Sequence, residues 1–204
     1  MIEVESPDKT DEQSAKQALL LAGISLFSEK GYASTPVREI VALAGVTKPV
    51  LYYYFQNKEG LFRAILDGAA QRQEELLEEA SRMTGTVLNR ILHLYRRIYE
   101  ELLPNQQLFR MIHNLIFGPP QGAPGYDMEG YHHRMLQAVK TIYKQGLERG
   151  EVKAADPDEV AMMIVGVTDY CFHLDYLHPE SADPARSERL LRLAFQGLVG
   201  KNNG

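Results

Sequence analysis

The sequence has 204 residues, 45% of them hydrophobic, and a formal net charge of −5 at pH 7. That length fits one domain, or a small head joined to a larger body. The single cysteine, Cys171, excludes a disulfide framework and a cysteine-based metal site, and it is typical of a reducing cytoplasm. No apolar run approaches the roughly 20 residues of a membrane span, and the acidic N-terminus is unlike a signal peptide. We therefore expect a cytoplasmic protein without a membrane partner.

The N-terminal third contains three expected helices after a flexible tail at residues 1–10. Thr10 and Gln13 fit a capping box that starts the first helix, which we expect to stop at Gly31. Its apolar side chains recur at helical spacing: Ala15, Leu19, Ala22 and Leu26. A longer helix followed by two short ones would form a helix-turn-helix, and the next two start signals supply the short helices.

The two short helices are each predicted from a threonine and a proline. Thr35, followed by proline, predicts a cap and a first turn for a helix over residues 37–44. Ala-Gly-Val at 44–46 predicts a tight turn. Thr47 then caps another short helix, with Pro49 in its first turn.

The rest of the chain has helical periodicity, with no strand alternation and no internal repeat. Asn57 is expected to cap a long helix that reaches about residue 83. Further helices are expected over residues 87–102, from 104, over 126–148, over 157–177 and over 185–199. The sequence therefore predicts an all-α fold, with a three-helix N-terminal head and a larger helical body.

Residues 31–66, GYASTPVREIVALAGVTKPVLYYYFQNKEGLFRAIL, resemble the DNA-binding head of the TetR family of bacterial transcriptional repressors. The matching elements are Gly31-Tyr32, Thr35, Ile40, Ala44-Gly45-Val46, Leu51-Tyr52-Tyr53-Tyr54-Phe55 and Asn57-Lys58-Glu59. YKQGLERGEV at 143–152 also looks like the family's regulatory body. The resemblance implies a DNA-binding domain at 11–57 and a ligand-binding and dimerisation domain at 58–204. It further implies a homodimer, double-stranded operator DNA and a small-molecule inducer.

The three consecutive tyrosines lie on the helix that would read DNA. Leu51 and Phe55, four residues apart, share a face that should be buried, while Tyr53 points nearly opposite. Tyr52 and Tyr54 flank the buried face on its two sides. A tyrosine hydroxyl can bind phosphate, and its ring can pack on sugar and thymine methyl groups. The alternative is that all three tyrosines belong to the core.

Two lysines bracket this stretch, and we expect them to have different roles. Lys48 lies at the leading end of the helix, where it could donate to guanine, or it could be an ordinary solvated lysine. Lys58 begins the next helix, where an exposed helix start favours phosphate. The full set of predicted DNA-binding residues is Thr35, Thr47, Lys48, Pro49, Tyr52, Tyr53, Tyr54 and Lys58. Residues 1–60 nevertheless hold six Lys and Arg against eight Asp and Glu, a difference of −2, whereas a basic head would be a stronger DNA footprint.

The body carries methionine, aromatic and histidine residues that could line an adaptable apolar pocket, or could equally be plain core. The predicted ligand-binding residues are Phe109, His113, Phe117, His132, Met135, Met163 and Tyr170. We expect an apolar or amphipathic inducer, no cofactor and no metal, because the histidines lack ligand spacing. Cys171 is expected to be a small buried hydrophobe.

The last two predicted helices are apolar over a wide arc and could pair across a two-fold axis as a four-helix bundle. The residues predicted for this dimer interface are Val160, Ile164, Val167, Leu191, Phe195 and Leu198. Three functions compete at this point. They are a ligand-controlled transcriptional repressor, a helical ligand-binding or interaction protein whose head no longer reads DNA, and a helical enzyme. No catalytic constellation supports the enzyme.

Overall fold

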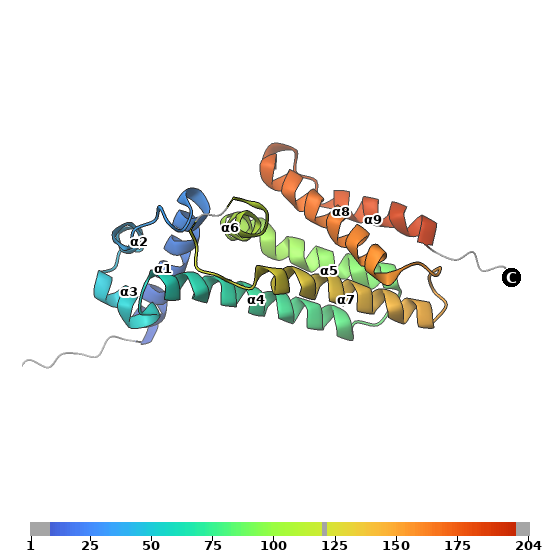
Figure 1. Ribbon diagram of the computed structural model, residues 1–204, viewed down its shortest axis with the longest axis horizontal. Coiled ribbons are helices and arrows are strands. Elements are labelled where there is room, and N and C mark those ends of the chain that lie inside the picture. The colour runs from blue at the N-terminus through green and yellow to red at the C-terminus, as the bar shows by residue number, and fades with distance from the viewer. Residues whose placement is uncertain (1–8, 120–121, 199–204) are drawn as a thin grey trace, which may run out of the picture. The chain divides into compact units, whose positions relative to one another are not determined.

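The computed structural model describes residues 9–119 and 122–198, and all of its regular elements are helices (Figure 1). The α-helices are α1 (Lys9–Lys30), α2 (Val37–Leu43), α3 (Lys48–Phe55), α4 (Lys58–Arg82), α5 (Val87–Leu102), α6 (Gln106–Phe117), α7 (Met128–Glu148), α8 (Pro157–Leu177) and α9 (Ala185–Leu198). Two short 3₁₀ helices, η1 (Leu103–Asn105) and η2 (Pro179–Ser181), join them. The predicted all-α class is confirmed. The predicted tail at 1–10 lies outside the described residues except for its last two, which already belong to α1.

The chain divides into two compact units that differ from the predicted domains. The first combines the described residues up to Ala70 with Gln107–Tyr126, and the second combines Gln71–Gln106 with the described residues from Asp127 on. The division falls within α4, not at the predicted boundary between residues 57 and 58. Most of helix α6 therefore belongs to the same unit as the helix-turn-helix elements, and α4 belongs to both units.

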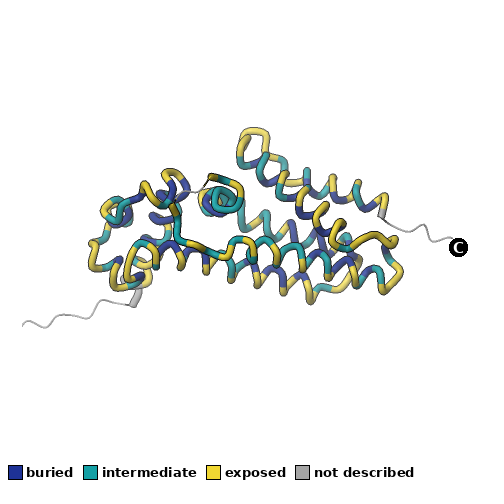
Figure 2. Tube along the Cα trace, in the orientation of Figure 1, coloured by how far each residue is buried: buried dark blue, intermediate teal, exposed yellow. Residues whose placement is uncertain are grey.

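The first unit has a small core formed by α1 to α4. Leu19, Ile40 and Leu51 are fully buried, one from each of the first three helices. Gly23 allows α1 to lie against α4, because a Cβ there would meet the Leu61 and Ile65 side chains at 3.0–3.1 Å. Burial alternates with exposure along each of these helices (Figure 2).

The second unit is a bundle of α5, α7, α8 and α9 with the later part of α4. Helices α7 and α8 pack extensively, and α5 contacts both α7 and α9. Gly146 is required for one of these contacts, because a Cβ there would lie 2.1 Å from the Val87 side chain. The buried Arg90 guanidinium donates to the Gln145 amide oxygen at 2.5 Å and to the carbonyl oxygens of Ala80 and Ser81. It thereby ties α5 to α7 and to the end of α4.

Helix starts follow the sequence at most positions. The side chains of Asn57, Thr86, Asp127 and Asp156 accept backbone N–H groups at the starts of α4, α5, α7 and α8. Thr47 holds the cap position of α3, but its side chain makes no cap hydrogen bond. The predicted cap at Thr35 is wrong, because Pro36 occupies that position in α2.

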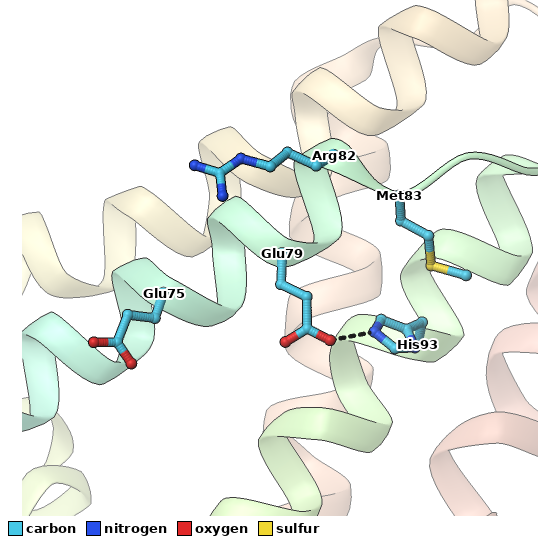
Figure 3. A pocket seen from close by; sticks show the side chains of 5 residues that line it. All are labelled: Glu75, Glu79, Arg82, Met83 and His93. Atoms are coloured by element: carbon cyan, nitrogen blue, oxygen red, sulfur yellow. Dashed lines mark hydrogen bonds and ion pairs between the residues drawn. The ribbon is translucent and has the colours of Figure 1, made fainter.

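A polar groove follows the end of α4 and the facing turn of α5 (Figure 3). Glu79 on α4 and His93 on α5 point toward each other, with their Oε1 and Nε2 atoms 2.8 Å apart. Arg97 also approaches Glu79 at 3.4 Å. The hydrogen bond from His93 and the charge of Arg97 hold the pKa of the Glu79 carboxyl below its usual value. The groove therefore holds an ion-pair network that joins α4 to α5.

Helix α8 is the one described helix that is long and apolar enough to cross a membrane by length and composition alone, with a mean hydropathy of 1.2. Core helices of globular proteins pass the same criterion, and 44% of the α8 window is buried inside the protein.

Candidate DNA-binding surface and ligand-binding body

Helix α3 is anchored by two buried side chains and exposes the others. Leu51 is fully buried and Phe55 is 6% exposed, and both belong to a helix that packs on α1 and α2. Tyr53 is 72% exposed and Tyr52 is 48% exposed. The predicted separation of the Leu51 and Phe55 face from Tyr53 is therefore confirmed. The core alternative fails for these two tyrosines.

Tyr54 has an intermediate position. It is half-buried, and its ring centroid lies 4.9 Å from that of Tyr53 in an edge-to-face arrangement and 6.2 Å from that of Phe55. Such ring contacts stabilise a fixed side-chain orientation. Tyr54 can thus hold Tyr53 in place at the surface of α3.

The turn between α2 and α3 depends on a glycine. Gly45 has φ of 68°, in the left-handed region that side chains other than glycine rarely adopt. The Gly45 and Val46 amides donate to the carbonyl oxygens of Ala42 and Val41. These bonds close the turn tightly and set the direction in which α3 leaves α2.

The junction between α3 and α4 is equally restricted. Gln56 adopts φ of 65°, and the Asn57 side chain accepts the Gly60 amide at 2.8 Å. A Cβ at Gly60 would lie 1.9 Å from the Phe55 carbonyl oxygen, which leaves no room for any other residue without a backbone shift. The end of α3 therefore lies directly against the first turn of α4.

Two predicted DNA-binding residues are engaged inside the first unit. The Thr35 hydroxyl is fully buried and lies 2.8 Å from the Gly31 carbonyl oxygen and 3.3 Å from that of Leu26, to which it can donate. The Lys58 ammonium donates to the carbonyl oxygens of Tyr32 and Thr35 at 2.9 and 3.0 Å. The Thr35 side chain is therefore not presented to solvent, and the ammonium of the half-buried Lys58 donates to backbone carbonyl oxygens instead of pointing outward as the sequence-based prediction required. That prediction overlooked how the loop after α1 folds back on α4.

Internal ion pairs offset part of the acidic charge of the first unit. Glu39 pairs with Lys30 at 2.8 Å, and Glu59 pairs with Arg63 at 2.9 Å. Lys48 and Arg38 are exposed and form no ion pair with any side chain that the structure describes. The Lys30–Glu39 pair leaves the formal difference of −2 unchanged, but Lys48 and Arg38 remain as positive charges that are not used in ion pairs of the described residues.

The predicted ligand-binding residues are divided between the two units. In the first unit, the rings of Phe109, His113 and Phe117 follow one another along α6 with centroids 5.8 and 5.0 Å apart. In the second, His132 and Met135 are half-buried on α7. None of these five residues lines the groove between α4 and α5 or the cleft between α5 and the start of α9.

Met163 and Tyr170 do not fit the predicted pocket. They are 38% and 61% exposed on α8, turned away from the buried face of that helix. The error arose because α8 is apolar on nearly all sides, so its periodicity does not distinguish interior from surface. The buried face carries Cys171 instead, at 2% exposure, as expected for a small hydrophobe, and burial raises the pKa of its thiol.

A half-exposed polar pair of the second unit was not predicted from the sequence. Asp169 on α8 faces His132 on α7, with 3.9 Å between the carboxylate Oδ2 and the imidazole Nδ1. Burial raises the pKa of Asp169 to about 6 and that of Tyr131 to about 12. The Tyr95 hydroxyl of α5 is also buried, without a hydrogen-bond partner among the described residues. Nothing in the sequence spacing brings these residues from α5, α7 and α8 together.

A separate cleft of about 370 Å³ lies between α5 and the start of α9. Leu92, Tyr95 and Leu191 form its buried floor, and Arg96 pairs with Glu188 at 3.4 Å at its edge. The volume is in the range of small-ligand sites. No residue of the predicted ligand set reaches this cleft.

The predicted dimer interface also needs correction. Val160, Ile164, Leu191 and Phe195 are at most 4% exposed within a single chain, so they form the core of the second unit. Val167 is half-buried, and the side chain of Leu198 lies outside the described residues. The apolar side chains that α8 and α9 do expose are Met162, Met163, Tyr170, Leu177, Leu190 and Leu193. On each helix, these exposed side chains lie away from the face that is buried in the second unit.

Three N-terminal helices that share a small apolar core, with a short exposed helix after a glycine turn, define a helix-turn-helix protein. The family described as "Bacterial regulatory proteins, tetR family" matches residues 19–65. The repressor BepR of Brucella suis biovar 1 is 34% identical over 177 residues, which cover 84% of this chain and 85% of BepR. The chain therefore belongs to the TetR family of transcriptional regulators.

Solved structures show the same all-α fold. NalD of Pseudomonas aeruginosa, the secondary repressor of the MexAB-OprM multidrug efflux pump, superposes with a TM-score of 0.69 at 24% identity. The match covers 94% of this chain and 98% of NalD. The SmeT–triclosan complex gives a TM-score of 0.73 at 20% identity, over 93% of this chain and 94% of SmeT.

Proposed function

We propose that this regulator is a repressor that binds operator DNA as a homodimer and is released by an apolar or amphipathic small molecule. The observation that carries the DNA-binding part is the outward surface of α3. Lys48, Pro49, Tyr52 and Tyr53 are all exposed around the buried Leu51. A short helix held on a rigid turn, with its polar side chains outward, has the geometry to enter a major groove.

The exposed side chains of α3 divide the work of recognition. Lys48 stands at the N-terminal end, where it can reach guanine O6 or N7. The hydroxyls of Tyr52 and Tyr53 can bind phosphate oxygens, which fixes the register of the helix on the duplex. The ring of Tyr53 also packs edge-to-face with that of Tyr54, a contact that favours one side-chain orientation. We therefore assign Lys48 to sequence reading and Tyr53 to positioning.

The test is selection of bound duplexes from a random-sequence pool, followed by gel shift on the enriched sequence. We expect a palindrome whose half-sites lie about one helical turn, or a multiple of it, apart. Lys48→Ala should narrow the affinity gap between this duplex and a scrambled one by roughly 1–3 kcal/mol per altered contact. A pool that shows no enrichment would instead support an interaction protein whose head no longer reads DNA.

The exposed apolar face of α8 and α9 supports the homodimer. Met162, Met163 and Tyr170 of α8 and Leu190 and Leu193 of α9 leave large apolar side chains in solvent. The exposed Gly166 and Gly197, where a Cβ would meet no atom of the chain, leave their helix surfaces open to close approach. Two such faces related by a two-fold axis would form a four-helix interface.

The dimer is tested by Leu193→Glu, which places a charge in the proposed seam without touching the core. We expect a monomer in sedimentation, unchanged helical circular dichroism and loss of operator binding. Gln137→Glu is the control, because it adds the same charge at an exposed position of α7, outside the proposed seam. An unchanged dimer in Leu193→Glu would place the interface elsewhere.

The proposed inducer class rests on the body residues and on the relatives. BepR and NalD are named as repressors, and SmeT was solved with triclosan, an apolar aromatic phenol. In the second unit, Tyr131, His132 and Asp169 could orient the polar end of such a molecule. Helix α4 belongs to both units, so a ligand that shifts it would change the spacing of two α3 helices. DNA and ligand would then weaken each other's binding by the same factor.

Triclosan is a suitable first probe, followed by small molecules that co-purify with the protein and are identified by mass spectrometry. A true inducer should lower operator affinity about 5- to 150-fold, the usual range of such coupling. A compound that binds but leaves operator affinity unchanged is not an inducer.

A further inference from the structure

Lys58, at the first position of α4, has contacts that a phosphate-binding lysine would not need. Its ammonium donates to the carbonyl oxygens of Tyr32 and Thr35 at 2.9 and 3.0 Å. The same nitrogen lies 4.1 Å from the centroid of the Tyr32 ring, within cation–π distance. An ammonium has three N–H groups, so two carbonyls and one ring face use its whole capacity.

The ammonium of Lys58 has no carboxylate partner among the described residues. No described ion pair includes Lys58, and burial lowers the pKa of its ammonium. Partial removal of an ammonium from water costs free energy, and here hydrogen bonds to carbonyl oxygens and the contact with the ring must offset that cost. Its neighbour Glu59 instead pairs with Arg63 at the surface of α4.

The loop that Lys58 holds has further contacts at Tyr32 and Thr35, whereas Ala33 and Ser34 between them are exposed. The Tyr32 ring packs edge-on against Phe62 of α4 and also against Phe27 of α1, with centroids 5.0 and 5.6 Å apart. The buried Thr35 hydroxyl binds the Gly31 carbonyl in the same loop. Helix α2 begins two residues after Thr35, so the position of this loop sets where α2, and through the Gly45 turn α3, is placed.

The first turn of α4 thus meets both ends of the helix-turn-helix. On one side Gly60 lies against the last carbonyl of α3, and on the other Lys58 holds the loop before α2. We propose that Lys58 is a positioning residue, which fixes the helix-turn-helix on α4 through the 32–35 loop rather than by contacting DNA phosphate. This inference rests on the proposed DNA-binding function.

The two roles predict opposite results for a change at Tyr32. Tyr32→Leu removes the ring but keeps the lysine and its charge. If Lys58 positions the loop, Tyr32→Leu should weaken binding of the selected duplex about three- to tenfold. If Lys58 binds phosphate, freeing its ammonium from the ring should leave affinity unchanged or raise it. Tyr32→Phe, which keeps the ring, is the control and should bind like the wild type.

Salt dependence separates the roles a second time. Lys58→Met should weaken binding with little change in the slope of log affinity against log salt. Loss of a phosphate contact would lower that slope by about one per subunit, so about two per dimer. The double variant with Tyr32→Leu should be no weaker than the weaker single variant, because both changes break the same contact. A slope lower by about two, with additive losses, would overturn the proposal.

Separate controls test whether a variant is folded and whether the protein binds DNA at all. If Lys58→Met is partly unfolded by circular dichroism at the assay temperature, Lys58→Arg replaces it. Arginine still binds phosphate, but its planar fork does not match the compact site of the ammonium. Weaker binding by Lys58→Arg supports the proposal, and wild-type binding contradicts it. A wild-type protein that enriches no duplex defeats the proposed function, whereas an enriched duplex bound equally by Lys58→Met and Tyr32→Leu defeats only the positioning role.

Discussion

Helices α3 and α8 show how differently sequence and structure are related in the two units. In α3, eight residues contain two buried apolar anchors, Leu51 and Phe55, and the remaining side chains are exposed or half-buried. In α8, apolar side chains occur on the buried face and on the exposed one alike, as Ile164 and Met162 show. A helix with one apolar seam can be oriented from its sequence, whereas a helix that is apolar all round cannot.

The largest effect we expect tests this contrast within α3. Leu51→Ala should destabilise the protein by about 2–5 kcal/mol, because it removes a fully buried side chain from the core of the first unit. Tyr53→Ala should change stability by no more than about 0.5 kcal/mol and yet weaken operator binding. Urea unfolding measures the first quantity, and titration of the selected duplex the second.

The reverse pattern would be informative. A large loss of stability in Tyr53→Ala would mean that this ring is buried by a contact outside the single chain. Normal operator affinity in the same variant would remove Tyr53 from the recognition surface and leave Lys48, Pro49 and Tyr52 as the candidate contacts.

The order of the helices, most of their bounds and the outward direction of Tyr53 could be predicted because they depend on local signals. Caps such as Asn57 and Asp156, and the periodic burial of Leu51 and Phe55, involve residues within four positions of each other. The contacts of Lys58 could not be predicted in this way. They join residues 23 and 26 positions apart through a loop with no regular structure.

The body was less predictable for a second reason. Phe195 was expected at a dimer interface and is core, whereas Tyr170 was expected in a pocket and is exposed. Both residues are apolar. The hydrophobic effect is non-directional, so it favours burial of a side chain but does not determine which neighbour buries it. Asp169 and His132 were separated by 37 positions in the sequence, so their approach depends entirely on how α7 packs on α8.

An effect of intermediate size tests the corrected role of Thr35. Thr35→Val keeps the shape of the side chain but removes the hydroxyl that meets the Gly31 and Leu26 carbonyls. We expect a loss of about 1–3 kcal/mol, the usual cost of leaving a buried polar group without its partner. Thr47→Val is the matched control. Its side chain is exposed and makes no cap hydrogen bond, so thermal unfolding should change little. Equal losses in the two variants would restore the original interpretation of both as caps.

The smallest expected effect concerns Asp169 and has a defined sign. Burial raises the pKa of this carboxyl to about 6, while the nearby His132 acts in the opposite direction. A raised pKa means that folding favours the protonated acid. Its contribution to stability is therefore present below about pH 4 and is lost as the pH rises through about 6. Asp169→Asn keeps the neutral form at every pH, so it should be more stable than the wild type above about pH 6.

The measurement is the free energy of unfolding in urea between pH 4 and pH 8 for the wild type and for Asp169→Asn. The difference between the two should grow with pH and level off above about 6. Glu148→Gln, an exposed carboxyl at the end of α7, is the control and should follow the wild type. Lower stability of Asp169→Asn at pH 8 would show that attraction to His132 outweighs burial. The carboxylate would then be a structural ion pair, not a polar group kept available for a ligand.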